Sequence, residues 1–228
     1  QSRPVIAAKD ARPFFLYYAT DDPHRANAIL PNGKPTFDTY PQPNRFGNRS
    51  KGYQGVHEVT YSPADVIVPA YLPDNAVTRA ELAEYYQSIS RLDQGVGRLI
   101  EILKETGNYE NMLIVYLSDN GAAFPGAKTT LYEPGMKLPL IVRAPGRVQP
   151  SAVQAAMVSW ADIAPTLLDV AGAATERTSF DGRSFRAGLD GGELLGREEV
   201  FASHTFHQVT MYYPMRAVRT RDYKLIHN

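Results

Sequence analysis

Three polar side chains in one loop have the chemistry to hold a metal ion beside an anion. Asp119 and Asn120 directly follow the apolar run Met112–Ser118 and offer a carboxylate and an amide oxygen, the hard donors that Ca²⁺ and Mg²⁺ prefer. Adjacent strand residues point to opposite faces, so both oxygens can reach one ion only where the strand ends and the chain turns. Gly121 gives the backbone freedom for that turn, and Lys128 adds a positive charge that can hold an anion.

Each of these residues also has a simpler interpretation. Asp, Asn and Gly are the commonest turn formers, and a lone lysine in a loop is usually a solvated surface residue. A β-lactamase interpretation of Ser-Asp-Asn also requires the motifs Ser-x-x-Lys and Lys-Thr-Gly. The sequence contains neither motif, so that interpretation fails.

Histidines can supply proton transfer to such a site. His24 follows the turn-forming stretch "TDDP", and an imidazole exchanges protons near neutral pH, so it can protonate a leaving group. A capped or solvated turn histidine is the alternative. His204 and His207 could form a metal pair, but no acid or third ligand is near them in the sequence. A substrate-lining role, or none, is preferred for them.

Short apolar runs predict the strands that must position these residues. Pro13–Ala19, Met112–Ser118 and Leu138–Ala144 are too short for helices, and the continuous apolar run at Met112–Ser118 is typical of the middle of a parallel sheet. After a Gly-rich segment, three further runs predict a smaller, partly antiparallel unit: Glu199–His204, Met215–Thr220 and Asp222–Asn228.

Helical periodicity predicts a long amphipathic helix over Thr78–Thr106. Thr78 and Glu81 have the spacing of a capping box at its start, and Gly107 is placed to stop it. A second helix is predicted over Trp160–Gly172, with Asp162 near its start.

Strands that alternate with helices predict an α/β sheet, in which ligands bind at the carboxyl ends of the strands. His24 and the Asp119–Asn120 pair both follow predicted strands, and Lys128 lies in the loop after the second. Together these residues predict a binding site for a tetrahedral oxyanion. Chemistry would require a nucleophile and more metal ligands than these residues supply.

The composition is that of a globular protein without a dominant charge. The 228 residues are 43% hydrophobic, and 24 basic residues balance 24 acidic ones, so no global field favours nucleic acid or an acidic membrane. The absence of cysteine removes disulfides, thiolate ligands and a cysteine nucleophile. No apolar run approaches the roughly 20 residues of a membrane helix, and the first residues do not form a signal peptide. The chain is expected to be a piece of a longer protein.

A long stretch between the first predicted strand and the first helix shows no periodicity. Residues 26–61 are rich in Pro, Gly, Asn, Lys and Arg, which is typical of a functional loop or an insertion. Within it, Asn48-Arg49-Ser50 matches a glycosylation sequon, but chance explains the match better.

The stretches "PFFLYYATDDPHR" and "LIVYLSDNGAAFPGAKTTLYEPGMKLPLIVRAPG" together resemble the sulfatases, a family of the alkaline phosphatase superfamily. Within the family, "YSPADVIVPAYLPDN" and "VTMYYPMR" are most similar to the heparan N-sulfatases, or N-sulfoglucosamine sulfohydrolases. The resemblance implies the carboxyl-side part of an alkaline-phosphatase-like α/β fold, with a mostly parallel sheet flanked by helices. Residues 1–190 would belong to the catalytic domain, and residues 191–228 would begin a smaller antiparallel subdomain.

The same resemblance implies a role for each candidate residue. Asp119 and Asn120 match a pair of Ca²⁺ ligands, with Mg²⁺ the less favoured ion. Lys128 matches the basic residue that contacts the sulfate, and His24 matches the histidine that contacts it or protonates the leaving atom. Asp22 is a weaker candidate for orienting the site, and His207 is expected to line the sugar pocket.

One part of the family pattern is missing. Its nucleophile is a formylglycine made from the Cys or Ser of a Cys/Ser-x-Pro-x-Arg motif, and its first metal ligands are an Asp-Asp pair near the amino terminus. The motif does not occur here, and Asp21-Asp22 belongs to the histidine stretch. The isolated chain is therefore expected to be inactive and to bind Ca²⁺ poorly.

The activity implied for the complete protein is hydrolysis of the sulfamate groups of glucosamine in heparin or heparan sulfate fragments. Two alternatives stay open: an O-sulfatase or phosphoester hydrolase of the same superfamily, and a non-catalytic fragment that binds sulfated glycan. A sulfated saccharide is the expected partner, without nucleic acid or membrane, and homo-oligomerisation is left open. The family implies a periplasmic or secreted location in bacteria and a lysosomal one in animals.

Overall fold

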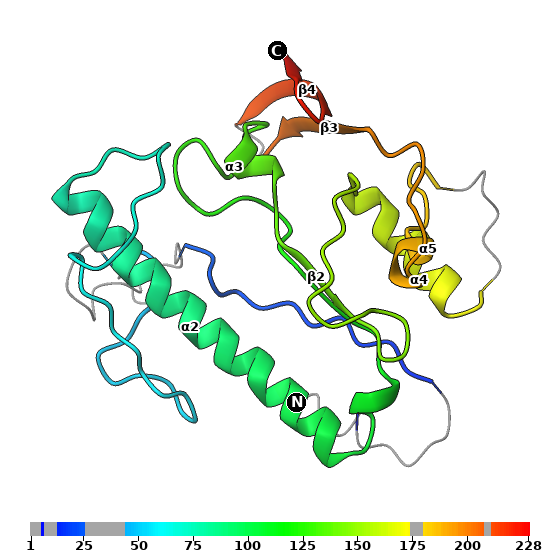
Figure 1. The fold of residues 1–228 in the computed structure, drawn as a ribbon. Helices are drawn as coiled ribbons and strands as arrows, with labels where there is room; N and C mark the ends of the chain where they lie inside the picture. Colours follow the sequence, from blue (N-terminus) through cyan, green and yellow to red (C-terminus); the bar gives the residue numbers. More distant parts are fainter. Residues whose placement is uncertain (1–5, 7–12, 26–43, 174–179, 208–210) are drawn as a thin grey trace. The chain divides into compact units, whose positions relative to one another are not determined.

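The computed structural model describes residues 6, 13–25, 44–173, 180–207 and 211–228 (Figure 1). The chain forms two compact units, residues 1–110 and 111–228, and each is described by itself. The part of the predicted loop 26–61 that precedes residue 44 lies outside the described residues. The predicted division of the chain after residue 190 stays a prediction.

The first unit is built around one long helix, α2 (Ala76–Glu105). It begins two residues earlier than expected, because the side chain of Asn75 accepts a hydrogen bond from the Thr78 N–H at 2.9 Å and caps the helix. The predicted capping box of Thr78 and Glu81 is therefore wrong. Both residues lie inside the helix, and the Glu81 carboxylate instead receives a hydrogen bond from Arg25 at 2.7 Å.

The carboxyl end of α2 is where the sequence predicts it. Gly107 adopts a positive φ of 72° just beyond the helix, a conformation that glycine adopts without steric cost. Its N–H donates to the Lys104 carbonyl, and the Asn108 N–H donates to the Leu103 carbonyl. This paired pattern satisfies the last carbonyls of the helix and ends it sharply.

Segment Pro13–Ala19 differs from its prediction as a buried strand. It runs as an extended trace without a strand partner among the described residues (Figure 1). Phe15 and Tyr17 are 74% and 80% exposed. A buried strand needs hydrogen-bonded neighbours and covered faces, and the described part of this unit consists of helix and loops.

The second unit contains two small sheets. In the first, β1 (Ile114–Leu117) pairs with β2 (Leu140–Arg143) in antiparallel register. Both strands were predicted, but the expectation that β1 lies in the middle of a parallel sheet is not met. The connection, residues 118–139, is long enough for a parallel crossover, which takes about a dozen residues or more and is usually helical. Its helix is only the four-residue α3 (Glu133–Met136), however, and β2 returns antiparallel.

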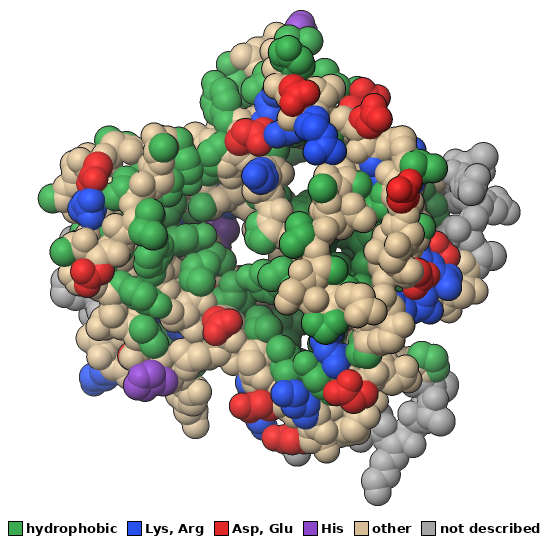
Figure 2. All heavy atoms as spheres, viewed as in Figure 1, with side chains coloured by type: hydrophobic (Ala, Val, Ile, Leu, Met, Phe, Trp, Pro, Cys, Tyr) green, Lys and Arg blue, Asp and Glu red, His purple; other side chains and the backbone are tan. Residues whose placement is uncertain are grey.

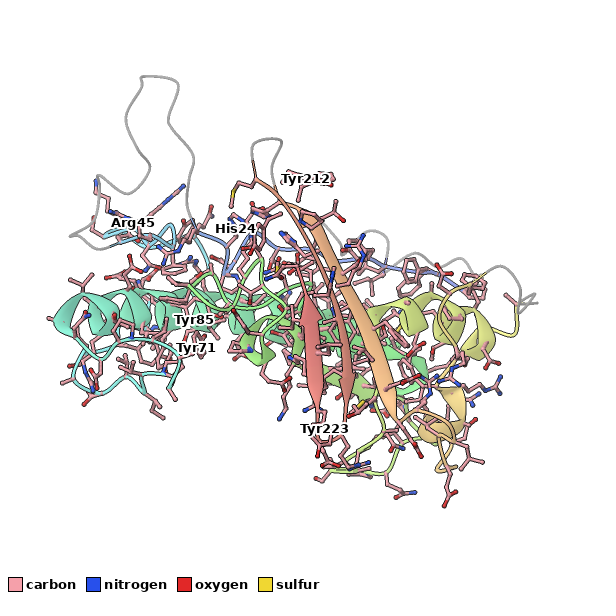
Figure 3. All side chains as sticks on the ribbon, turned by 90° about the horizontal axis from the view of Figure 1, so that it is seen from above. His24, Arg45, Tyr71, Tyr85, Tyr212 and Tyr223 are labelled. Carbon is pink, nitrogen blue, oxygen red and sulfur yellow. The ribbon has the colours of Figure 1, made fainter. Side chains whose placement is uncertain are left out.

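The second sheet confirms the predicted antiparallel carboxyl-terminal strands. Its order is β3 (Glu199–Phe206), β4 (Tyr212–Thr220) and β5 (Lys224–His227), all antiparallel. Tyr212 and Tyr223 lie near opposite ends of β4 (Figure 3). One face of this sheet carries a small buried core, made of Met215 and Ala217 with Leu131 from the loop before α3.

The helical part of the second unit is also close to its prediction. A short helix, η3 (Trp160–Asp162), leads into α4 (Ile163–Val170), and Ser159 and Asp162 form a capping box at the start. Asp162 is buried and pairs with Arg197 at 2.6 Å, which anchors the segment before β3. Two short helices complete the described elements: η2 (Tyr109–Asn111) and α5 (Arg186–Leu189).

Charged side chains of both signs are interspersed over the visible surface (Figure 2), in keeping with the balanced charge of the sequence. Within the part of the chain that the structure describes, none of the helices has the length and apolar character to span a bilayer.

Candidate functional site

The turn after β1 holds Asp119 and Asn120 in a fixed backbone geometry. Asp119 Oδ1 accepts a hydrogen bond from the Asn120 N–H at 2.9 Å, and the Ser118 hydroxyl donates to the Asn120 carbonyl at 2.8 Å. Trp160 Nε1 donates to the Ser118 carbonyl at 2.9 Å, so the start of the η3–α4 helix ties the turn in place. The end of the strand is thus braced by a helix that follows it by some forty residues in the sequence.

Each side chain of the pair has an oxygen that is chemically suited to a cation. The Asn120 amide nitrogen donates to the Gly121 carbonyl at 2.8 Å, which leaves the amide oxygen as the end that can face an ion. Asp119 is exposed and has a second carboxylate oxygen beyond the one bonded to the backbone. Both donors fit Ca²⁺ chemically, but the ion takes about six to eight oxygen ligands. Among the described residues, no group of three or more acidic or histidine side chains is placed to hold a metal.

The loop that follows is closed by two glycines that touch. A Cβ on Gly121 would lie 2.4 Å from the Pro134 carbonyl oxygen and 2.9 Å from the Gly135 Cα. A Cβ on Gly135 would lie 2.3 Å from the Thr130 carbonyl oxygen. The predicted need for glycine at Gly121 is thus explained by close backbone approach, since its φ is not in the left-handed region. The two glycines clamp the loop ends together.

Lys128 lies within this closed loop. Its N–H donates to the Ala122 carbonyl at 3.0 Å, and the next residue, Thr129, has a φ of 66°. A β-branched residue rarely adopts this left-handed conformation. The backbone at Thr129, directly after Lys128, is therefore held in this conformation by its surroundings and not by local preference.

One cavity of about 1270 Å³ in the second unit brings most of the predicted site residues together. Asp119, Asn120 and Lys128 line it, and so do His204 and His207 from β3 and the turn after it. His204 is half-buried on the same face of the sheet as Met215, and His207 is exposed. The predicted carboxylate, amide, lysine and two histidines thus all line the same cavity.

His24 belongs to the first unit. Its imidazole is exposed, and Nδ1 lies 2.8 Å from the Arg25 carbonyl oxygen. Because a carbonyl can only accept, we assign the hydrogen of the neutral ring to Nδ1. Nε2 is then the nitrogen that can take up or release a proton.

Both flanks of His24 are fastened to α2. The Asp22 carboxylate receives hydrogen bonds from Arg91 at 2.5 and 2.9 Å and from the Ser88 hydroxyl at 2.7 Å. On the other side, Arg25 pairs with Glu81. The weaker prediction that Asp22 orients the site stays a prediction, and the structure gives it a partner for that task, Arg91.

Sequence reasoning missed these α2 residues, although a signal existed. Glu81, Ser88 and Arg91 are spaced so that they fall on one face of a helix. A polar face of this kind is usually taken for a solvated one. Arg91 instead is buried, and it also donates to the Asn48 side chain at 2.6 Å and to the Phe46 carbonyl at 2.9 Å.

The buried Arg91 network also decides the sequon question. Asn48 is 0% exposed, and its amide donates to the Glu84 carbonyl at 3.0 Å. Burial raises the pKa of the Glu84 carboxyl. A side chain enclosed in this way cannot accept a glycan in the folded chain, which agrees with the interpretation of the sequon as a chance match.

Glu133 is a second residue that sequence reasoning missed. It lines the same cavity as Lys128, and hydrogen bonds from Lys224 and then Arg219 lower the pKa of its carboxyl. The Glu133–Lys224 pair is 2.5 Å long. No local pattern could reveal it, because its partners lie on β4 and β5, far along the sequence.

Comparison with family models gives two overlapping matches. The model described as Sulfatase matches residues 1–173. The model described as N-sulphoglucosamine sulphohydrolase, C-terminal, matches residues 126–228.

Curated relatives agree with these matches. The chain is 37% identical to human N-sulphoglucosamine sulphohydrolase over 99% of its own length and 46% of the relative's. It is 30% identical to human N-acetylglucosamine-6-sulfatase over 84% of its own length and 35% of the relative's. The chain thus spans less than half of the length of these relatives.

The chain also resembles parts of solved structures. A phosphonate monoester hydrolase from Silicibacter pomeroyi superposes with a TM-score of 0.58 at 27% identity, over 73% of this chain and 37% of that one. The structure of a protein in complex with its substrate, D-glucosamine-2-N,6-O-disulfate, superposes with a TM-score of 0.58 at 26% identity, over 69% of this chain and 34% of that one. The predicted alkaline-phosphatase-like α/β fold is confirmed by these neighbours.

Proposed function

This chain belongs to the sulfatase family, and from that premise we propose that it is part of an enzyme that hydrolyses the sulfamate group of glucosamine in heparin or heparan sulfate fragments. The likeness to human N-sulphoglucosamine sulphohydrolase, which extends over almost the whole chain, supports the choice of an N-sulfate. The enzyme would act outside the cytoplasm, in a periplasm, the exterior or a lysosome.

The observation that carries the proposal is the cavity in which a metal-type oxygen pair and a lysine meet. Asp119 and Asn120 would hold Ca²⁺ together with ligands from outside this chain, and the bound ion would polarise the sulfate oxygens. Lys128 would contact those oxygens as a compact positive charge and stabilise the negative charge that develops on them. His207 would line the pocket for the sugar.

His24 would manage the proton that a sulfamate requires. When the sulfur–nitrogen bond breaks, the departing nitrogen must gain a proton, a task suited to an imidazole. Its Nδ1–H is bonded to the Arg25 carbonyl, so the doubly protonated ring would release its proton from Nε2 to the departing nitrogen and return to the neutral Nδ1–H form. The formylglycine nucleophile that the family implies would come from outside this chain, and no step is derived through it.

Two further candidates have specific support. The likeness to N-acetylglucosamine-6-sulfatase favours an O-sulfatase, and the likeness to a phosphonate monoester hydrolase favours a related phosphorus ester. Rates with matched sulfamate, sulfate and phosphate esters would rank the enzymatic candidates.

The deciding experiment is sulfate release from N-sulfoglucosamine by the parent protein that contains this chain, with and without Ca²⁺. Release that depends on calcium and falls by about a hundredfold or more in Lys128→Ala is the expected result, since removal of one group that stabilises a transition-state oxyanion typically costs that much. Release from O-sulfates or phosphate esters alone would transfer the assignment to those candidates. A parent without any nucleophile would leave the glycan-binding fragment.

A further inference from the structure

The loop that carries Lys128 is fastened to the carboxyl-terminal sheet by a cluster of three charged residues. Glu133, at the start of α3, lies 2.5 Å from Lys224 Nζ on β5 and 3.3 Å from Arg219 Nε on β4. Arg219 and Lys224 are paired neighbours in the register of these strands. One carboxylate thus bridges two strands of the sheet.

A second contact reinforces the first. Lys224 Nζ also donates to the Leu131 carbonyl at 3.1 Å, so one ammonium group holds both the side chain of Glu133 and the backbone before it. The Leu131 side chain is buried against Met215 and Ala217 of β4. The segment between Lys128 and α3 is therefore held by charge and by apolar packing on the same face of the sheet.

The loop needs such restraint because its backbone is strained beside the lysine. Thr129 has a φ of 66°, a conformation that persists only where the surrounding structure over-determines it. The Gly121–Gly135 contact fixes the two ends of the loop. The contacts of Leu131 and Glu133 restrain the part that follows Thr129.

We propose that Glu133 is a positioning residue for Lys128: with Lys224 and Arg219 it locks the loop onto the carboxyl-terminal sheet, so that the lysine amine faces the cavity. Glu133 acts through the loop and has no chemical step of its own. The inference rests on the proposed function for the role of Lys128, whereas the fastening of the loop can be tested without any activity.

The test compares variants of the 228-residue chain by hydrogen exchange of the loop amides 126–137, followed by kinetics in the parent protein. Glu133→Gln and Lys224→Met should each speed exchange of these amides by about two- to fivefold, the range of partly exposed ion pairs. Lys224→Arg, which keeps the charge, should restore the slow exchange. In the parent, Glu133→Gln should lower kcat by about fivefold or more with KM little changed, because small misplacements of a charged group are costly.

Asp190 offers a matched control. It also has two basic partners, Arg147 at 2.7 Å and Arg186 at 3.4 Å, and its side chain is 40% exposed against 47% for Glu133. Asp190→Asn should leave both the loop exchange and kcat unchanged.

The outcomes separate this inference from the proposed function. Unchanged loop exchange in Glu133→Gln overturns the positioning role, and so does equal loosening in Asp190→Asn, which would indicate general destabilisation. A loosened loop with unchanged kcat also overturns it. A parent that releases no sulfate from N-sulfoglucosamine overturns the proposed function, while the exchange data still decide whether Glu133 fastens the loop.

Discussion

The His24 turn and the two ends of the Lys128 loop are held by different physical means. The His24 turn is fastened by charged side chains on both flanks, Asp22 to Arg91 and Arg25 to Glu81. The Lys128 loop is closed by backbone contact between two glycines, which leaves no room for a single added carbon. The first arrangement resists change through electrostatics and the second through steric exclusion.

This difference suggests which changes each region tolerates. The ion pairs of the His24 turn can lengthen or weaken gradually, because long side chains readjust and water can replace a lost partner. A Cβ added at either glycine would lie less than 3 Å from backbone atoms, and these atoms cannot make room without moving the chain. We therefore expect the Lys128 loop to respond to the smallest substitutions and the His24 turn to respond to loss of charge.

The largest effect is expected from Gly135→Ala. The new methyl carbon would lie 2.3 Å from the Thr130 carbonyl oxygen and 2.6 Å from the Ala127 carbonyl oxygen, both backbone atoms. The free energy of unfolding of the second unit should fall by about 3 kcal/mol or more, the upper end for overpacking. Chemical denaturation followed by the Trp160 fluorescence of this unit would measure it.

Gly97→Ala in α2 is the control for this substitution. A Cβ at Gly97 would meet no atom within 4 Å, and alanine favours a helix over glycine by up to about 1 kcal/mol. The control should leave stability unchanged or raise it. Equal losses in both variants would refute the argument from backbone contact.

A smaller effect is expected from Arg91→Met, which removes the cation that holds Asp22. Loss of one partner of a buried ion pair costs about 3–5 kcal/mol, but the Asp22 side chain is 28% exposed and can regain some water. We expect a loss of about 2–3 kcal/mol in the first unit. Thermal unfolding would measure it by circular dichroism at the helical band of α2.

Arg98→Met provides the comparison on the same helix. Arg98 bonds to Glu101 and Glu105 on the surface, and exposed ion pairs contribute little to stability. If Arg91→Met lowers the free energy of unfolding no more than Arg98→Met does, the Asp22–Arg91 ion pair does not hold the His24 turn.

Features encoded within a few residues of each other could be predicted from the sequence. The periodicity of α2, the apolar run of β1 and the turn at Asp119-Asn120 each follow from local patterns, and the structure has all three. The start of α2 was misplaced because Asn75 and Thr78 are both good caps, and local pattern does not choose between them.

Features that depend on distant partners could not be predicted. Whether Pro13–Ala19 forms a buried strand depends on neighbours that its own sequence does not specify. The contact of Gly121 with Gly135 requires the loop to be closed, and Glu133 finds Lys224 only after β4 and β5 have paired. Local periodicity contains no information about these contacts.

The smallest effect concerns the acid response of two carboxyls, one in each unit. Hydrogen bonds from Lys224 and Arg219 lower the pKa of Glu133 below its unfolded value, so its contribution to stability is present above the unfolded pKa and is lost as the pH falls through the folded one. Burial raises the pKa of Glu84, so its contribution is present below the unfolded pKa and is lost as the pH rises through the folded one.

Glutamine substitutions at Glu133 and Glu84 should change the free energy of unfolding in opposite directions at neutral pH. At neutral pH, Glu133→Gln should lower the free energy of unfolding by less than about 1 kcal/mol, because the pair is partly exposed and screened, whereas Glu84→Gln should remove the penalty of a buried charge. Both differences from the parent chain should vanish in strong acid, where each carboxyl is protonated. Denaturation midpoints from about pH 3 to pH 7, the range of carboxyl titration, would test this. Shifts of the same sign in both variants at neutral pH would mean that the two units do not differ in how they hold their carboxyls.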